Sequence, residues 1–120
     1  MSEKYAKERE QFGGPIANFQ IIQHKLVDML VALEGARLIT YEAAWKISRR
    51  LTADFEVAAA KAWSGNSFEK VANQAMRIFS GLGSRKDYDI QLYYRRIKPL
   101  KMFLGDPFFW QQKIASLAGL

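Results

Sequence analysis

The residues around Gly13-Gly14-Pro15 are of types that bind anions and planar rings. Arg9 carries a guanidinium whose donors match phosphate oxygens in pairs, and Gln11 and Gln20 place side-chain amides on either side of the break. Phe12 offers an aromatic face that can cover a planar ring. The break also frees the first backbone N–H groups of the following helix to donate to an anion. These parts suit a planar cofactor that carries a pyrophosphate, but on these residues alone an ordinary turn between helices remains the simpler interpretation.

The chain has few residues that could support other kinds of catalysis or bind a metal ion. There are no cysteines, which excludes disulfides, thiolate zinc sites, iron–sulfur clusters and cysteine nucleophiles. His24 is the only histidine and shares a helix face with Asp28, which is too few ligands for a metal ion. No serine stands in a recognisable nucleophile turn, and no Walker-type phosphate loop is present. We predict no metal site and expect His24 to be structural or solvent-facing.

Positive charge gathers in one segment. The chain has a net charge of +6, and six basic residues against two aspartates give residues 85–101 a net charge of +4. Such a segment attracts nucleic acid, an acidic membrane surface or cofactor phosphates, and its ordinary alternative is a solvated helix face. The run Tyr93–Arg96 adds two aromatics beside two arginines. A basic helical nucleic-acid-binding module is therefore an alternative function.

Helices must position these residues, because strand signals are absent. Apolar residues at spacings of three and four predict one long amphipathic helix over residues 16–50 and another from Thr52 or Asp54 to a glycine-rich stop at residues 80–83. Shorter helices are expected over residues 2–12, 86–98 and 107–120, the second of them broken by Pro99 and the third opened by Pro107. The prediction is an all-α, four-helix-bundle-like fold with two long antiparallel helices, whose first helix is truncated.

The length and composition suit one soluble domain over residues 1–120. No apolar run reaches the roughly 18 residues that span a bilayer, and the N-terminal residues are too charged for a signal peptide. We therefore expect a cytoplasmic protein without a membrane span.

A longer motif surrounds the glycine break. The sequence YAKEREQFGGPI at residues 5–16 is followed by Phe19-Gln20 and by HKLVDM at residues 24–29. These residues resemble the C-terminal region of acyl-CoA dehydrogenases, whose pattern there is YAxERxQFGxPIxxFQxxxxxLAD. The resemblance covers nearly the whole chain to about Lys101, through the following segments: Ala36–Tyr41, Ala58–Lys61, Ser80–Gly83 (usually Gly-Gly-x-Gly in the family) and Tyr94-Arg95.

The resemblance implies a flavoprotein oxidoreductase of fatty acid metabolism that holds FAD and removes two hydrogens across the α and β carbons of an acyl-CoA. Electrons then pass to an electron-transferring flavoprotein. It implies that this chain is the C-terminal helical bundle, without the N-terminal and middle domains, and that it forms a homodimer or tetramer through the bundle. The family positions that contact FAD, in part from a neighbouring subunit, are Arg9, Gln11, Phe12, Gln20 and Gly81.

Two departures from the family pattern bear on the activity. Arg77 stands where many members have a glutamine that contacts FAD, and a cation there can still serve phosphates. Leu104 stands where most members have the catalytic glutamate, and leucine cannot take a proton. The sequence therefore shows no catalytic residue, and we expect the isolated chain to be inactive. A non-catalytic subunit of a hetero-oligomeric flavoenzyme is an alternative, and nucleic acid is not an expected partner.

Overall fold

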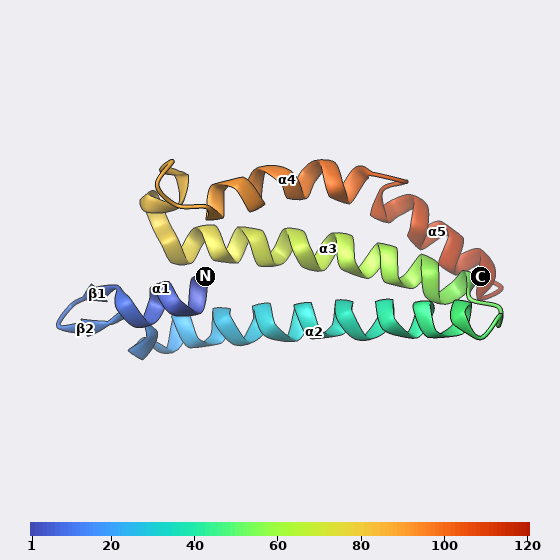
Figure 1. The fold of residues 1–120 in the computed structure, drawn as a ribbon, viewed down its shortest axis with the longest axis horizontal. Coiled ribbons are helices and arrows are strands. Elements are labelled where there is room, and N and C mark those ends of the chain that lie inside the picture. Colours follow the sequence, from blue (N-terminus) through green and yellow to red (C-terminus); the bar gives the residue numbers. More distant parts are fainter.

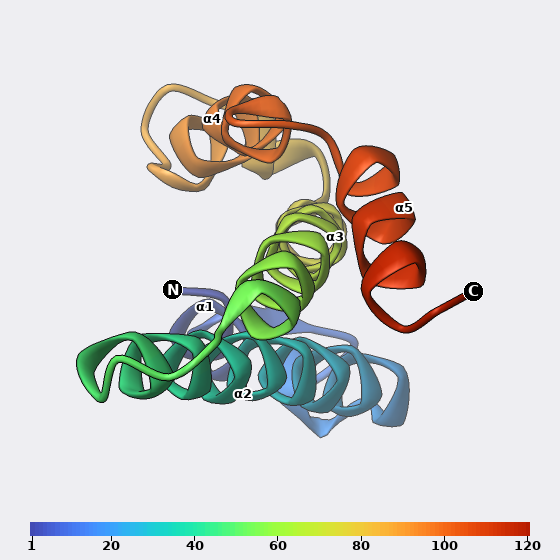
Figure 2. The same cartoon turned by 90° about the vertical axis from the view of Figure 1, so that its right-hand side faces the viewer.

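Two long antiparallel helices form the frame of the molecule. The computed structural model describes residues 1–120, and in it α2 (Gln20–Ser48) and α3 (Asp54–Phe79) lie side by side (Figure 1). The helices α4 (Ile90–Met102) and α5 (Pro107–Leu117) lie on other sides of α3, so that α3 is the central helix (Figure 2). The predicted all-α fold with two long helices and shorter ones beside them is confirmed.

Short elements complete the end of the frame at which α2 begins. The chain starts with α1 (Ser2–Glu8), which packs against both long helices, and continues into a hairpin of two strands, β1 (Glu10–Gln11) and β2 (Gly14–Pro15). The 3₁₀ helix η1 (Ile16–Asn18) leads into α2, and a second one, η2 (Ser80–Ser84), follows α3. Because α1 has only seven residues, the fourth helix position of the bundle is filled over a short length only.

The molecule is elongated and has a thin core. It measures 55 × 27 × 24 Å and has a radius of gyration of 17.2 Å, whereas a compact chain of this length has about 13.6 Å. Only 18 of 120 residues are buried, and no large side chain is completely buried. Much apolar surface therefore remains for contacts outside the chain.

Small residues let three helices approach α3. The residues that α2 buries are Ala32, Ala36 and Ala43, and α3 buries mainly alanine, glycine and serine. Such side chains permit short distances between helix axes. Lys61 of α3 fixes the end of α4, because its ammonium donates to the carbonyl of Leu100 at 3.1 Å and lies 3.3 Å from that of Lys101.

The predicted helix boundaries near the N-terminus are wrong by several residues. The first helix ends at Glu8 rather than at Phe12, and α2 begins at Gln20 rather than at Ile16. The residues between them form the hairpin and η1 because Phe12 and Gly13 have positive φ, which no right-handed helix accepts. The Ile16 N–H donates to the Arg9 carbonyl at 2.8 Å and closes this loop.

The fourth helix was also predicted wrongly, because α4 begins at Ile90 rather than near Lys86 and passes through Pro99 to Met102. Proline removes one hydrogen bond from a helix but can still accept one, and the Pro99 carbonyl accepts from the Phe103 N–H at 2.9 Å. Pro107 opens α5 as predicted, with the Asp106 side chain accepting from the Phe109 N–H at 2.8 Å.

The start of α3 uses neither predicted N-cap. Ala53 is the N-cap, and no side chain caps this end, so Thr52 and Asp54 were wrong as caps. An ion pair between Lys46, in the last turn of α2, and Glu56, in the first turn of α3, joins the two helices here. No helix of the molecule is both long enough and apolar enough to cross a membrane.

Replacing Glu56 with glutamine should lower the thermal midpoint at neutral pH and leave it nearly unchanged in acid. The hydrogen bond that the Glu56 carboxylate accepts from Lys46 holds the pKa of this carboxyl below its ordinary value of 4.5. The contribution of the pair is therefore present above pH 4.5 and is lost as the pH falls through the lowered pKa. Thermal melts of wild type and Glu56→Gln across this range measure it. Glu42→Gln, at an exposed glutamate of α2, is the control, and a difference independent of pH would contradict the prediction.

Candidate functional site

The hairpin has a backbone that its sequence does not favour. Its strands pair Glu10 with Pro15 and Gln11 with Gly14, so the two-residue loop is Phe12-Gly13. The φ angles of these two residues are 53° and 88°, and two positive values are what a type I′ hairpin turn requires. Asparagine, aspartate and glycine suit such positions, whereas a bulky side chain is strained there. Phe12 therefore occupies a costly position.

The packing of Phe12 within the chain does not explain this cost. Its side chain is 95% exposed, and its one aromatic partner is Phe19, at 6.1 Å and nearly perpendicular. Strained residues that persist without local packing are typical of binding sites. The ring of Phe12 is therefore open to solvent and available for contacts outside the chain.

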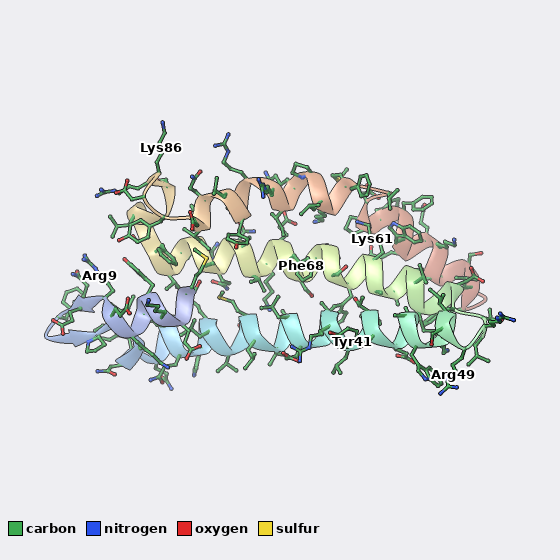
Figure 3. All side chains as sticks on the ribbon, viewed as in Figure 1. Arg9, Tyr41, Arg49, Lys61, Phe68 and Lys86 are labelled. Carbon is green, nitrogen blue, oxygen red and sulfur yellow. The ribbon has the colours of Figure 1, made fainter.

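The structure brings three of the predicted site residues together. Arg9, Gln11 and Phe12 line one open cavity of about 380 Å³, whose other walls are Phe19 and apolar residues of η1, α2 and α3. The Arg9 side chain is exposed and makes no ion pair within the chain (Figure 3). Gln11 turns its amide nitrogen to the Glu10 carbonyl, at 2.8 Å. The cavity thus combines a free guanidinium, an aromatic face and an apolar wall.

The other three predicted residues lie outside this cavity. Gln20 is the first residue of α2, Arg77 lies in the last turn of α3, and Gly81 lies in η2. All three are exposed, and only their chain neighbours Ile21 and Ile78 reach the cavity wall. The chain alone therefore does not assemble the six residues into one site.

A stack of aromatic rings fixes α1 and with it the hairpin. Tyr5 stacks on Phe79 with ring centroids 4.1 Å apart, and Tyr88 meets both rings edge to face. These contacts join α1, the end of α3 and the segment before α4. The hairpin is thereby held on a rigid base.

The turn between α4 and α5 presents leucine where the family resemblance places a catalytic acid. Leu104 is 72% exposed with φ of 61°, and its carbonyl accepts from the Trp110 indole N–H at 3.0 Å. The nearby carboxylate of Asp106 is the N-cap of α5. No group of three or more histidine, cysteine, aspartate or glutamate side chains converges as a metal site would require.

Ion pairs within the chain neutralise part of the positive charge of residues 85–101. Arg85 pairs with Asp87, and Lys101 pairs with Glu69 of α3. The remaining basic side chains of residues 85–101 are exposed: Lys86, Arg95, Arg96 and Lys98. Lys86 points outward from the end of the molecule where α4 begins (Figure 3). Two of the six cations that motivated the nucleic-acid alternative are thus already engaged.

Sequence reasoning missed two features of this end of the molecule. Phe19 stands at a helical spacing that predicts the core, but it precedes α2 and packs on Phe12. Ser80 has φ of 54° and ψ of −142°, a region that is almost exclusive to glycine. The resemblance held a signal for the second feature, because the family usually has glycine at this position.

Replacing Ser80 with glycine should raise the free energy of unfolding by about 1 kcal/mol. Strained backbone of this kind costs about 1–3 kcal/mol. Relief of this strain stabilises the folded state, but the greater conformational entropy of glycine in the unfolded chain offsets part of that stabilisation. Urea unfolding followed by circular dichroism measures the change. Ser80→Ala is the matched control, because it removes the hydroxyl and keeps the Cβ atom. Equal stabilisation by alanine would show that strain at the Cβ is not the cause.

Comparison with known proteins finds matches to nearly the whole chain. A family model described as "Acyl-CoA dehydrogenase, C-terminal domain" matches residues 2–107. The 3-(aryl)acrylate reductase of Clostridium sporogenes is 41% identical over 113 residues, which cover 94% of this chain and 30% of that protein. Two solved structures match with a TM-score of 0.95 at 28% identity over 99% of this chain: butyryl-CoA dehydrogenase from Megasphaera elsdenii and a FAD complex of PigA. The chain spans 31% of each of those two chains.

Proposed function

The chain belongs to the acyl-CoA dehydrogenase family and corresponds to the C-terminal domain of its members. We propose that it contacts FAD and forms subunit contacts in a flavoprotein of this family. The observation that carries the proposal is the hairpin, where Phe12 is exposed on a strained turn beside the free guanidinium of Arg9. When bound, FAD supplies the acceptor for two hydrogens removed from an acyl-CoA. The complete protein then passes electrons to an electron-transferring flavoprotein.

The donor set of the hairpin fits the adenylate half of FAD. Arg9 binds pyrophosphate oxygens through its paired N–H donors, and Phe12 covers the adenine ring. Phe12 is 95% exposed, and the Arg9 side chain points away from the bundle (Figure 3). As the family resemblance implies, the FAD that they bind belongs to a neighbouring subunit. The FAD contacts that a partner subunit completes include Gln20, Arg77 and Gly81. The space beside Gly81 is open to a phosphate, because a Cβ built on this residue would meet no atom within 4 Å.

The domain is completed by a further helix. A largely apolar groove of about 640 Å³ runs between α2, α3 and α4, and Met1 and Ser2 of the short α1 line it. A helix that continues α1 toward its N-terminal side fills this groove and completes the four-helix bundle. The N-terminal and middle domains of the flavoprotein then supply the acyl pocket and the rest of the flavin site.

The chain itself contributes no proton acceptor to the chemistry. Leu104 cannot act as a base, and Asp106 caps α5. The 120-residue chain is therefore inactive by itself, and the base of the complete protein lies elsewhere. The leucine also favours a second candidate, a non-catalytic subunit in a hetero-oligomeric flavoenzyme.

Residue-resolved NMR titration tests the proposed contact even where affinity is weak. With ¹⁵N-labelled chain, FAD and ADP should shift the amide signals of the hairpin residues 9–14, whereas riboflavin, which lacks pyrophosphate and adenine, should not. Shifts confined to other helices, or equal shifts with riboflavin, would contradict the adenylate contact.

A further inference from the structure

The outward side of α4 carries a stripe of residues at helical spacing. Leu92, Arg95, Arg96 and Pro99 stand at positions i, i+3, i+4 and i+7, so they share one face of the helix, and all four are exposed. We name these four residues the α4 outer face. In both views α4 lies at the edge of the molecule, with no other helix on its outward side (Figures 1 and 2). No element of the chain therefore covers this face.

The positive charge of α4 is not balanced within the helix. Its sequence, IQLYYRRIKPLKM, contains four cations and no acidic residue. Lys101 pairs with Glu69 of α3, whereas Arg95, Arg96 and Lys98 make no ion pair. By contrast, both lysines of α1 pair with glutamates of their own helix. Neighbouring like charges repel one another, and an anionic partner would relieve this repulsion.

The outer face is apolar as well as charged. Its four residues and Leu100 line an open hollow of about 620 Å³. Leu92 is 42% exposed and Leu100 is 58% exposed, so two guanidiniums border an apolar surface. Arginine beside apolar side chains is typical of protein interfaces, where arginine is enriched and lysine is depleted.

Pro99 leaves a hydrogen-bond acceptor within this face. Because proline has no N–H, it cannot donate to the carbonyl of Arg95, which lies four residues earlier in the helix. This carbonyl therefore needs a donor from water or from a partner. The phosphate groups of a duplex provide neither such a donor nor an apolar side chain, whereas a protein surface provides both. The composition of the face thus favours a protein over nucleic acid.

The outer face is distinct from the groove that the further helix fills. Arg96 and Leu100 border both surfaces, whereas Leu92, Arg95 and Pro99 line the outer hollow alone. A helix bound in the groove therefore leaves most of the outer face open.

From these observations we propose that the α4 outer face binds an acidic protein. Carboxylates of this partner pair with Arg95 and Arg96, and one of its apolar side chains fills the hollow between them. Lys98 is exposed three residues after Arg95 and adds to the attraction. The bound protein lies beside the turn that holds Leu104, because α4 ends at Met102. The proposal goes beyond the FAD contact and does not depend on it.

Titration of the ¹⁵N-labelled chain with a synthetic helical peptide of glutamate and leucine tests the surface. The peptide should shift the amide signals of Leu92, Arg95 and Arg96, with an affinity that falls as salt is added. The same peptide with glutamine in place of glutamate should not shift them. Shifts confined to Leu26 and Leu30 would show that the peptide fills only the groove, and that result would overturn the proposal.

Charge reversal tests the role of the two arginines. Arg95→Glu/Arg96→Glu should weaken peptide binding by roughly 10-fold or more, because like charges across an interface are unfavourable. The matched control is Arg49→Glu/Arg50→Glu, which reverses another exposed pair of adjacent arginines that make no ion pair. It should leave the affinity unchanged, and equal losses in both variants would overturn the proposal.

A neutral variant covers the case in which charge reversal unfolds α4. Arg95→Gln/Arg96→Gln keeps long polar side chains on the helix and should retain the helical circular dichroism. It should also weaken peptide binding, by less than charge reversal does. Unchanged affinity in this variant would show that the arginines do not bind the partner.

Two further measurements separate an acidic protein from other occupants. Duplex DNA should bind the chain more weakly than the peptide at the same salt concentration, and tighter binding of DNA at Arg95 and Arg96 would assign the face to nucleic acid. The chain has no native cysteine, so Leu92→Cys provides a single thiol on the face. In the complete flavoprotein this thiol should react with a maleimide as fast as in the chain alone. Slower reaction would show that another domain or subunit covers the face, against the proposal.

Failure of this surface and failure of the FAD contact give different results. Arg9→Ala should leave peptide binding unchanged, and Arg95→Glu/Arg96→Glu should retain the hairpin shifts with ADP. Loss of one set of shifts without the other therefore identifies the proposal that has failed.

Discussion

Replacing Ala36 with leucine should lower the free energy of unfolding by about 1–3 kcal/mol, a large share of the stability of a domain this size. Ala36 is 2% exposed on the face of α2 that meets α3. That interface is made of small residues on both helices. The larger leucine side chain must therefore push the helices apart or adopt an unfavourable rotamer. Urea unfolding at fixed protein concentration measures the loss.

Ala44→Leu is the control for this prediction. Ala44 is exposed on the same helix, so both variants carry the same change in helix propensity and differ in burial. The exposed variant should stay within about 0.5 kcal/mol of wild type. Equal stability of the two variants would show that α2 and α3 are not in close contact through Ala36.

Replacing Arg9 with alanine should weaken the binding of FAD and ADP at the hairpin by roughly 10-fold or more. Charge-assisted hydrogen bonds contribute about 1.5–3 kcal/mol, and about 1.4 kcal/mol corresponds to a tenfold change in affinity. Arg9 is free to make them because no carboxylate of the chain pairs with it. The amide shifts of residues 9–14, titrated with ADP, report the affinity.

Two further variants distinguish the effect of the paired N–H donors of Arg9 from the effect of its charge. Arg9→Lys keeps the charge without the paired donors, so it should recover only part of the affinity. Arg49→Ala removes the same charge at the opposite end of the molecule (Figure 3) and should leave the binding unchanged. A similar loss in Arg49→Ala would indicate general electrostatic attraction rather than a site.

The exposed apolar residues lie on two surfaces that no element of this chain covers. The chain leaves α2 uncovered on its outer side and a groove open beside α1. Contiguous apolar surfaces of this kind are typical of protein interfaces. The thin core and the extended shape follow from these uncovered surfaces, because most helices of the chain are packed on one side only.

The sequence by itself determined the fold class and indicated the family. Helical spacing of apolar residues located α2 and α3, because one buried face imposes a period of 3.6 residues whatever lies against it. Pro107 and the glycines of residues 80–83 marked a helix start and a helix stop, because their backbone preferences are local. The motif from Tyr5 to Met29 pointed to the acyl-CoA dehydrogenase family, which the comparisons show.

Only the tertiary structure decided how the glycine break is built and which surfaces remain open. A hairpin with Phe12 at positive φ contradicts local preference, and it exists because α1 is anchored by the Tyr5 stack while the Arg9 carbonyl accepts from Ile16. The continuation of α4 through Pro99 likewise occurs where Lys61 of α3 holds the helix end. The exposure of large apolar residues of α2, such as Leu38 and Tyr41, depends on which helices lie beside α2, and the sequence pattern of one helix cannot contain that information.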